Sequence, residues 1–445
     1  MFKKYLNFRL FLTILFIIIW SALFGSLLKH HYEGGENFQS LQKIAVGISV
    51  IPKTAEDLIK SIIEGKNLNR PPVFTKHKDK ERFIRYILNE REALLILPRY
   101  DHSMSRSVVD VVDLKNFEVL HSYMHDIDEM NNKVKNIEEF PRLKTNNAPI
   151  RFQYRHPLIL EDGSLVSDGE NSIEFKIDFC SNLEWINDDE TFHHSKMLDH
   201  EKNILAGGMM KPKSKYVKQY SSRDYGDDSI IKINTDGKIL YNKSITEILI
   251  ENNLVDENIF FFNDPIHLND IEPALKDTKY WKKGDIFLSL RHQSAIIHYR
   301  PSTNKVINYL KGPFSQQHDV DIISDKEISI FNNNNFVINN EFSEILIYNF
   351  DTEEYKKLFN EQLKKNNFKT TTQGLSHIFE DGSLMIEEQN HGRIILFNNE
   401  GETEWEFVNK DKDGNIGFIS WSRVIEDKIF IEKFKSLVEN KKCLN

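Results

Sequence analysis

The stretch PLILEDGSLVSDGENSIEFKI at 157–177 returns in altered form as LSHIFEDGSLMIEEQNHGRIILF at 375–397. Both copies place an apolar run, the turn sequence EDGSL and a second apolar run in the same order. An Asp-Gly pair between two apolar runs is typical of a β-hairpin. Looser copies occupy 194–206, 284–298 and 318–331. The chain therefore repeats a unit made of short strands.

Repeats of about 40 to 70 residues, each with three or four short strands, are typical of β-propeller blades. We count six, from a first near 94–125 to a last over about 374–407. Strands within 416–433, including Trp421 and Ile429 to Ile431, are expected to close the ring. The sequence thus predicts an all-β fold, a six-bladed β-propeller over 91–435 with a tail at 436–445. A β-sandwich is the alternative, but its strands do not usually form a repeated sequence unit.

The N-terminus predicts a membrane segment. Lys3, Lys4 and Arg9 precede an uncharged apolar run at 10–28, which is long enough to cross a bilayer as a helix. The basic residues on its N-terminal side place Met1 in the cytoplasm and the body across the membrane. An uncleaved anchor over 1–30 is favoured over a cleaved signal peptide, whose apolar core is shorter. With either segment the body is exported, to the periplasmic side of the inner membrane in a bacterium.

Residues 31–90 have the pattern of a helical stalk or collar. Thr54 is a candidate cap for an amphipathic helix at 55–64, and Arg70-Pro71-Pro72 interrupts the pattern. A second helix is expected over Lys80–Leu95, passing into a strand.

Composition excludes several classes of protein. The 445 residues carry a net charge of -9, and no basic stretch is dense enough for a nucleic-acid partner. The two cysteines, Cys180 and Cys443, exclude a disulfide-stapled scaffold and a cysteine-based zinc site. Whether they pair with each other is left open.

Five histidines point to a shared site. Each stands just before the turn-and-strand unit of a different repeat: His156, His194, His267, His318 and His377. Equivalent blade positions converge on a propeller axis, so these side chains are expected to meet there. The strand 284–291 ends on Arg291, whose guanidinium can bind two oxygens of a tetrahedral anion at once. We therefore predict a site for a small anion.

A metal site is the weaker interpretation. His193, His194 and His200 are possible ligands, but HxH and HExxH spacings are missing from the sequence. The segment DKDGN at 411–415 is interpreted as a hairpin turn, since the rest of a calcium loop does not follow it. No metal is predicted.

Four segments now carry a family resemblance. They are HHSKML at 193–198, HLND at 267–270 with GDIFLSLRHQS at 284–294, QQHDVDIIS at 316–324 with ISIFNNN at 328–334, and GLSHIFEDGSLMIEE at 374–388. In order and spacing they resemble the bacterial arylsulfotransferases, exported six-bladed propellers that move a sulfuryl group between phenols. The resemblance covers roughly residues 150–410.

The resemblance implies a ping-pong sulfotransferase that needs no cofactor, with an aryl sulfate donor and a phenolic acceptor. It assigns the nucleophile, as a transient sulfohistidine, to His318, and catalytic support to His267, Arg291 and His194. Substrate-binding positions are Asn269, His377, His292 and His193. The insert after His267 is longer than usual and residues 31–90 look helical, so the acceptor and the oligomeric state are left open. The alternatives are a non-catalytic scaffold propeller and a sulfatase-like hydrolase of anionic esters.

Overall fold

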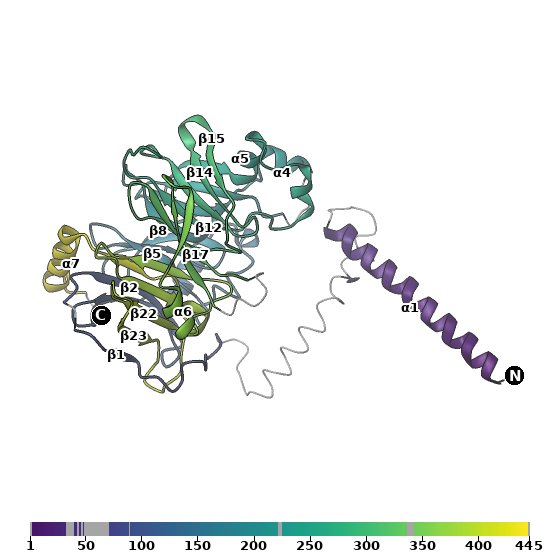
Figure 1. The fold of residues 1–445 in the computed structure, drawn as a ribbon, viewed down its shortest axis with the longest axis horizontal. Helices are drawn as coiled ribbons and strands as arrows, with labels where there is room; N and C mark the ends of the chain where they lie inside the picture. Colours follow the sequence, from purple (N-terminus) through teal and green to yellow (C-terminus); the bar gives the residue numbers. More distant parts are fainter. Residues whose placement is uncertain are drawn as a thin grey trace.

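The computed structural model describes residues 2–32, 40–41, 44–45, 48, 71–88, 90–220, 225–335 and 342–443. They form an N-terminal helix and a β-rich body (Figure 1). Helix α1 spans Phe2–Tyr32, and its segment Arg9–Lys29 is long and apolar enough to cross a membrane. The predicted apolar helix is therefore present. A signal sequence near the N-terminus has the same length and hydropathy.

The predicted helical collar is not confirmed. Residues 71–88 form turns and the short strand β1 (Phe83–Arg85), so the helix predicted over Lys80–Leu95 is wrong. The reason is tertiary packing, which overrides local propensity. Phe83 stacks on Phe117 with 4.0 Å between ring centroids, and β1 pairs with the last blade. The helix predicted at 55–64 lies outside the described residues.

The described residues of the body form four antiparallel sheets of four or five strands, each of them a separate blade. The first is β24 (Arg423–Ile425), β2 (Leu94–Asp101), β3 (Arg106–Asp113) and β4 (Glu118–Tyr123). The second is β12 (Leu268–Pro273), β13 (Ile286–Leu290), β14 (Ala295–Arg300) and β15 (Lys305–Leu310). The third is β16 (Val320–Ile322), β17 (Glu327–Asn332), β18 (Glu344–Asn349) and β19 (Glu354–Leu358). The fourth is β20 (Leu375–Ile378), β21 (Leu384–Glu388), β22 (Arg393–Phe397), β23 (Thr403–Val408) and β1.

The remaining sheet is continuous over seven strands, so the number of separate blades differs from the predicted six. Its strands are β5 (Arg155–Ile159), β6 (Leu165–Asp168), β7 (Ser172–Ile177), β8 (Leu183–Leu198), β9 (Ile204–Met209), β10 (Asp228–Ile233) and β11 (Ile239–Ser244). Strand β8 has 16 residues. It pairs with β7 as far as Phe192 and with β9 from Thr191 onward, which joins the strands of two repeats.

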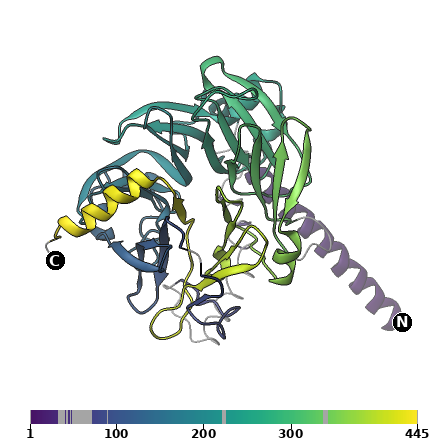
Figure 2. The same cartoon turned by 60° about the vertical axis from the view of Figure 1, so that its left-hand side comes forward.

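Figure 2 shows the strand groups arranged around a common centre, an all-β propeller-like fold. Apolar side chains from neighbouring groups fill six separate core clusters. Short helices and turns connect the strands: α3 (Ile127–Asn131), α4 (Lys215–Tyr220), α5 (Ile245–Glu251), α6 (Asn360–Lys365), η1 (Ile137–Glu139), η2 (Glu257–Phe261), η3 (Pro301–Thr303) and η4 (Gln389–His391).

Both ends of the body close the ring. Strand β24 from the C-terminal part pairs with β2, while β1 from the N-terminal part pairs with β23. Ile429 to Ile431, predicted as a closing strand, lie instead in helix α7 (Lys428–Asn440). Asp427 caps this helix by accepting hydrogen bonds from two backbone N–H groups, a contact that favours helix over strand. Beyond α7, a Cys180–Cys443 disulfide ties the chain end to the turn after β7.

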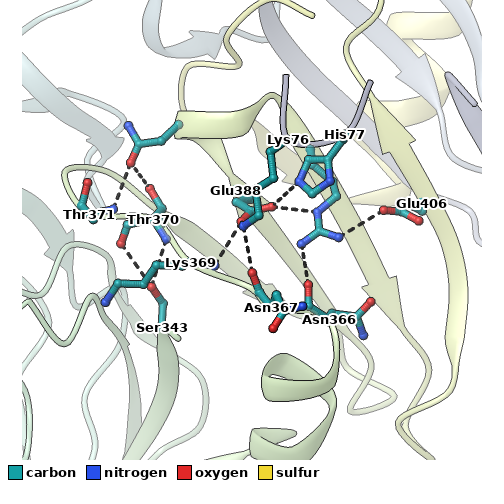
Figure 3. Close-up of polar contacts among 12 residues, drawn as sticks. Lys76, His77, Ser343, Asn366, Asn367, Lys369, Thr370, Thr371, Glu388 and Glu406 are labelled. Atoms are coloured by element: carbon teal, nitrogen blue, oxygen red, sulfur yellow. Dashed lines mark hydrogen bonds and ion pairs between the residues drawn. The ribbon is translucent and has the colours of Figure 1, made fainter. Parts of the chain in front are cut away.

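The segment before β1 is fixed to the last blade through a buried carboxylate (Figure 3). Glu388 accepts hydrogen bonds from His77 Nε2 and Arg393 Nε, both at 2.8 Å, and pairs with Lys76. The backbone N–H of Lys369 donates to the same carboxylate at 3.0 Å. Burial alone would raise the pKa of Glu388, but the His77 hydrogen bond and the charges of Arg393 and Lys76 lower that pKa to about 2.

Candidate active site

Four aromatic side chains share an unusual backbone conformation where the chain enters an inner strand. His156, His194, His267 and Trp421 have φ angles of 36°, 60°, 52° and 57°. A positive φ is uncommon for bulky residues and gathers at functional sites. The first two lie in β5 and β8, and the others lie just before β12 and β24.

The rings of these residues meet at the centre. The Trp421 ring centroid lies 5.5 Å from that of His156, 5.8 Å from that of His194 and 6.2 Å from that of His318. His194 and His267 are 5.2 Å apart. The structure thus brings four of the five histidines together. His377 is turned toward Glu426, with His377 Nε2 2.9 Å from a carboxylate oxygen, and does not join them.

A cavity of about 310 Å³ opens beside this cluster. Its wall includes His193, His194, Asp228, Asp264, His267, Arg291, Thr372 and Gln373. Four of the predicted site residues thus line the cavity: His193, His194, His267 and Arg291. Four do not, and these are His318, Asn269, His292 and His377.

His318 is fully buried, and its hydrogen bonds fix its tautomer. It precedes β16 and pairs with Phe331 of β17, so Asn333 after β17 comes to lie beside it. The Asn333 Nδ2 group donates to two backbone carbonyl oxygens, those of Thr370 and Gln373, which leaves its Oδ1 as the acceptor. His318 Nδ1 lies 2.7 Å from that oxygen and must carry the proton.

The other ring nitrogen of His318 is therefore the one with the free lone pair. Among the described residues, no group meets hydrogen-bond geometry with His318 Nε2, although the backbone of Thr372 acts on the ring and raises its pKa. Burial, opposed by the Asn333 hydrogen bond, lowers the pKa of His318 to about 3. The nearby charges of Arg291 and His267 contribute to this lowering. His318 is thus a neutral imidazole with an unprotonated Nε2 near neutral pH.

His267 and Arg291 stand side by side. The backbone N–H of Arg291, after β13, donates to the carbonyl of His267, before β12, at 3.0 Å. His267 Nδ1 lies 2.6 Å from a carboxylate oxygen of Asp264. Burial would raise the pKa of Asp264, but its hydrogen bond to His267 and the charges of nearby histidines lower it. Asp264 therefore stays ionised and orients the His267 ring.

Arg291 is held by two neighbours. Its Nη1 lies 2.6 Å from His292 Nε2, and its Nη2 donates to Gln316 Oε1 at 3.1 Å. Because a guanidinium can only donate, His292 Nε2 is the acceptor and His292 Nδ1 carries the proton, which it gives to the carbonyl of Asp264. His292 thus orients Arg291 from outside the cavity wall.

Asn269 acts on the backbone rather than in the cavity. It is fully buried, and its Nδ2 donates to the carbonyl of Gln317 at 2.8 Å. This contact fixes the segment that carries His318.

Asp264, His267 and His292 also place ligand-type atoms within 4.8 Å of one another. They do not fit a metal ion, because the Arg291 guanidinium occupies the lone pair of His292 and adds positive charge there. His200, another possible ligand in the sequence, lines a different hollow beside Gly284. The absence of a metal stays a prediction.

Four residues of the site were not foreseen as such from the sequence: Asp228, Asp264, Asn333 and Trp421. Two of them carried a weak signal, since Asp264 comes three residues before His267 and Asn333 lies in the FNNN run. Asp228 and Trp421 carried none, because only the fold brings them to the histidines.

Comparison with known proteins gives one informative match. A family model described as arylsulfotransferase (ASST) matches residues 156–410, and a model for a domain of unknown function, DUF6035, matches residues 39–202. No curated protein matches the chain.

Among solved structures, a Bacteroides caccae protein of unknown function aligns at 10% identity with a TM-score of 0.47, over 75% of this chain and 99% of that one. A catalytically inactive virginiamycin B lyase of Staphylococcus aureus with quinupristin aligns at 11% identity with a TM-score of 0.39, over 73% of this chain and 87% of that one. Both likenesses are too distant to carry an argument.

Proposed function

Because the chain belongs to the arylsulfotransferase family, we propose that it transfers a sulfuryl group from an aryl sulfate ester to a phenolic acceptor through a transient sulfohistidine on His318. The observation that carries the proposal is the tautomer of His318. Its Nδ1–H is committed to Asn333, so its Nε2 offers a lone pair at neutral pH.

In the first half-reaction, His318 Nε2 attacks the sulfur, an N–S bond forms, and the ester S–O bond breaks. Sulfuryl transfer resembles phosphoryl transfer, in which positioning and electrostatics supply most of the catalysis. Arg291 and His267 on the cavity wall are suited to binding the sulfuryl oxygens. The second half-reaction reverses these bonds with the acceptor oxygen, so no cofactor is consumed.

His318 lies behind the cavity wall, whereas Thr372 and Gln373 are part of that wall. The Gln373 carbonyl accepts from the same Asn333 side chain that orients His318. We infer that a small shift of the 372–373 segment on substrate binding brings the sulfur into reach of Nε2.

A scaffold propeller and a sulfatase-like hydrolase are the alternatives. The test is release of 4-nitrophenol from 4-nitrophenyl sulfate with and without added phenol. The proposal requires release that depends on phenol and disappears in His318→Ala while the variant stays folded. Free sulfate formed equally without phenol would mean a hydrolase, and no turnover with a panel of aryl sulfates would mean a scaffold.

We further infer that the seven-stranded sheet occupies two blade positions, which gives six positions around the centre. The six core clusters between strand groups support this arrangement. The same proposal assigns 1–30 to a membrane anchor, 31–90 to a stalk, 91–435 to the catalytic domain and 436–445 to a tail, with β1 of the stalk paired to the last blade and Cys443 of the tail bonded to Cys180.

An exported body, on the periplasmic side in a bacterium, is favoured by the Cys180–Cys443 disulfide, since such bonds persist in oxidising compartments.

A further inference from the structure

Three side chains form a hydrogen-bonded row along the cavity wall. His193 Nε2 lies 3.0 Å from Asp228 Oδ1, and His193 Nδ1 lies 2.7 Å from His194 Nδ1. Asp228 and His193 are buried, with 1% and 4% of their surface exposed. His194 is partly exposed at the cavity wall. With its Nδ1 occupied by His193, His194 has Nε2 left for a substrate.

Asp228 also fixes the position of the neighbouring histidine segment. Its Oδ2 accepts a hydrogen bond from the backbone N–H of Leu268 at 3.2 Å, one residue after His267. One carboxylate at the start of β10 therefore contacts both β8 and the start of β12. Asp227 beside it has different partners: its carboxylate accepts hydrogen bonds from the Ser214 backbone N–H and from Ser244 Oγ.

The hydrogen bonds in the row decide where the protons are. An ionised Asp228 can only accept, so His193 Nε2 carries a proton. The close approach of the two Nδ1 atoms requires one donor and one acceptor. When His193 is the imidazolium, it donates from Nδ1, and His194 is then the neutral tautomer that presents Nε2–H to the cavity. When His193 is neutral, the direction reverses and His194 presents a lone pair.

Resting on the function proposed above, we propose that Asp228, His193 and His194 form a two-way proton relay that serves both half-reactions. In the first, His194 Nε2–H goes to the departing phenolate oxygen while the Nδ1 proton of His193 moves to His194 Nδ1. His193 is left neutral, still donating to Asp228. In the second, the acceptor phenol gives its proton to His194 Nε2 and the Nδ1 proton returns to His193. Protons balance over the cycle, and no other acid or base is needed.

The charges around the relay agree with this division of roles. Burial lowers the pKa of His193, but the Asp228 hydrogen bond and the charges of Asp228, Asp168 and Asp264 outweigh it, and the net pKa is raised. The pKa of His194 is lowered well below its usual value by burial, with further lowering from nearby positive groups. The largest of these contributions come from His193, His267 and Arg155. His194 is thus neutral and His193 is the proton reservoir.

In this scheme His194 is the catalytic residue, and His193 and Asp228 are positioning residues that act through it. The test compares Asp228→Asn with Asp227→Asn, a matched control one residue away. In a ping-pong enzyme, kcat/KM for the donor reports only the first half-reaction. We would measure it with 4-methylphenol as the acceptor throughout. Two donors are used: 4-nitrophenyl sulfate, whose phenolate leaves without a proton, and phenyl sulfate, whose phenolate needs one.

We expect Asp228→Asn to lower kcat/KM for phenyl sulfate on the order of 100-fold and for 4-nitrophenyl sulfate by less than about tenfold, because only the first donor needs general acid catalysis. Asp227→Asn lowers both by one common factor. With phenyl sulfate, the alkaline limb of the pH profile moves to lower pH in Asp228→Asn, since the imidazolium of His193 is less stable without the carboxylate.

Equal losses with both donors in a folded Asp228→Asn protein, or an unmoved alkaline limb, would overturn the relay. Either result would leave the transferase proposal intact. Failure of the unchanged protein to transfer sulfate from either donor would instead overturn the proposed function. The same measurements on His193→Gln serve as a second test. This variant interrupts the relay but keeps the hydrogen bond between Asp228 and the Leu268 backbone.

Discussion

Replacing Glu388 by Gln tests whether the segment before β1 is fixed to the body through one buried charge. The Glu388 side chain is fully buried and is bonded by His77, Lys76 and Arg393. Lowering the pKa of its carboxyl from 4.5 to about 2 corresponds to about 3 kcal/mol of folding free energy at neutral pH. Removal of one partner of a buried ion pair costs about 3 to 5 kcal/mol, which agrees.

For a cooperative unit of roughly 350 residues, a loss of about 3 kcal/mol lowers Tm by about 4 °C. The assay is thermal unfolding of the detergent-solubilised full chain, with Glu400→Gln, an exposed carboxylate on the same blade, as the control.

Since the folded pKa is depressed, the contribution of Glu388 is fully present above pH 4.5. It is lost as the pH falls toward 2, so the Tm difference between the two proteins should shrink there. A Tm for Glu388→Gln equal to that of Glu400→Gln, or a difference independent of pH, would refute this reasoning.

Three further predictions concern the site and the chain end. Asn333→Leu should lower kcat on the order of 100-fold, because His318 loses the acceptor that fixes its tautomer; an unchanged kcat would contradict this role. Arg291→Lys should lower kcat/KM by about 10² to 10³, since a point charge cannot replace the fork that binds two oxygens; steady-state kinetics with full activity would show that the fork is not used. Cys180→Ser should lower stability by about 2 to 4 kcal/mol through release of α7, with Ser181→Ala in the same turn as the control for denaturant unfolding.

The sequence repeat of short strands was sufficient to predict an all-β propeller-like fold, because every blade of a propeller has the same local pattern. It could not predict that β8 continues through the junction of two repeats, since the continuity depends on pairing with both β7 and β9. The helix α7 and the strand β1 also depend on partners distant in the sequence. Phe83 packs on Phe117, and Cys443 reaches Cys180 across 263 residues.

The same division holds for the site. Histidines at equivalent repeat positions could be predicted to converge, because the fold brings such positions to one axis. His377 was an exception, as Glu426 draws its side chain away. Asp228, which orients His193, became visible only through its hydrogen bonds, and Asn333, which orients His318, carried only a weak signal in the sequence.

The central claim is that His318 carries the sulfuryl group during transfer. The most direct measurement is mass analysis of the protein after incubation with 4-nitrophenyl sulfate and no acceptor, followed by peptide mapping under alkaline conditions that preserve sulfohistidine. We expect the added mass of one SO3 group on the peptide that contains His318, its loss when phenol is added, and its absence in His318→Ala. An unmodified peptide during active turnover, or a sulfuryl group on another residue, would contradict the account.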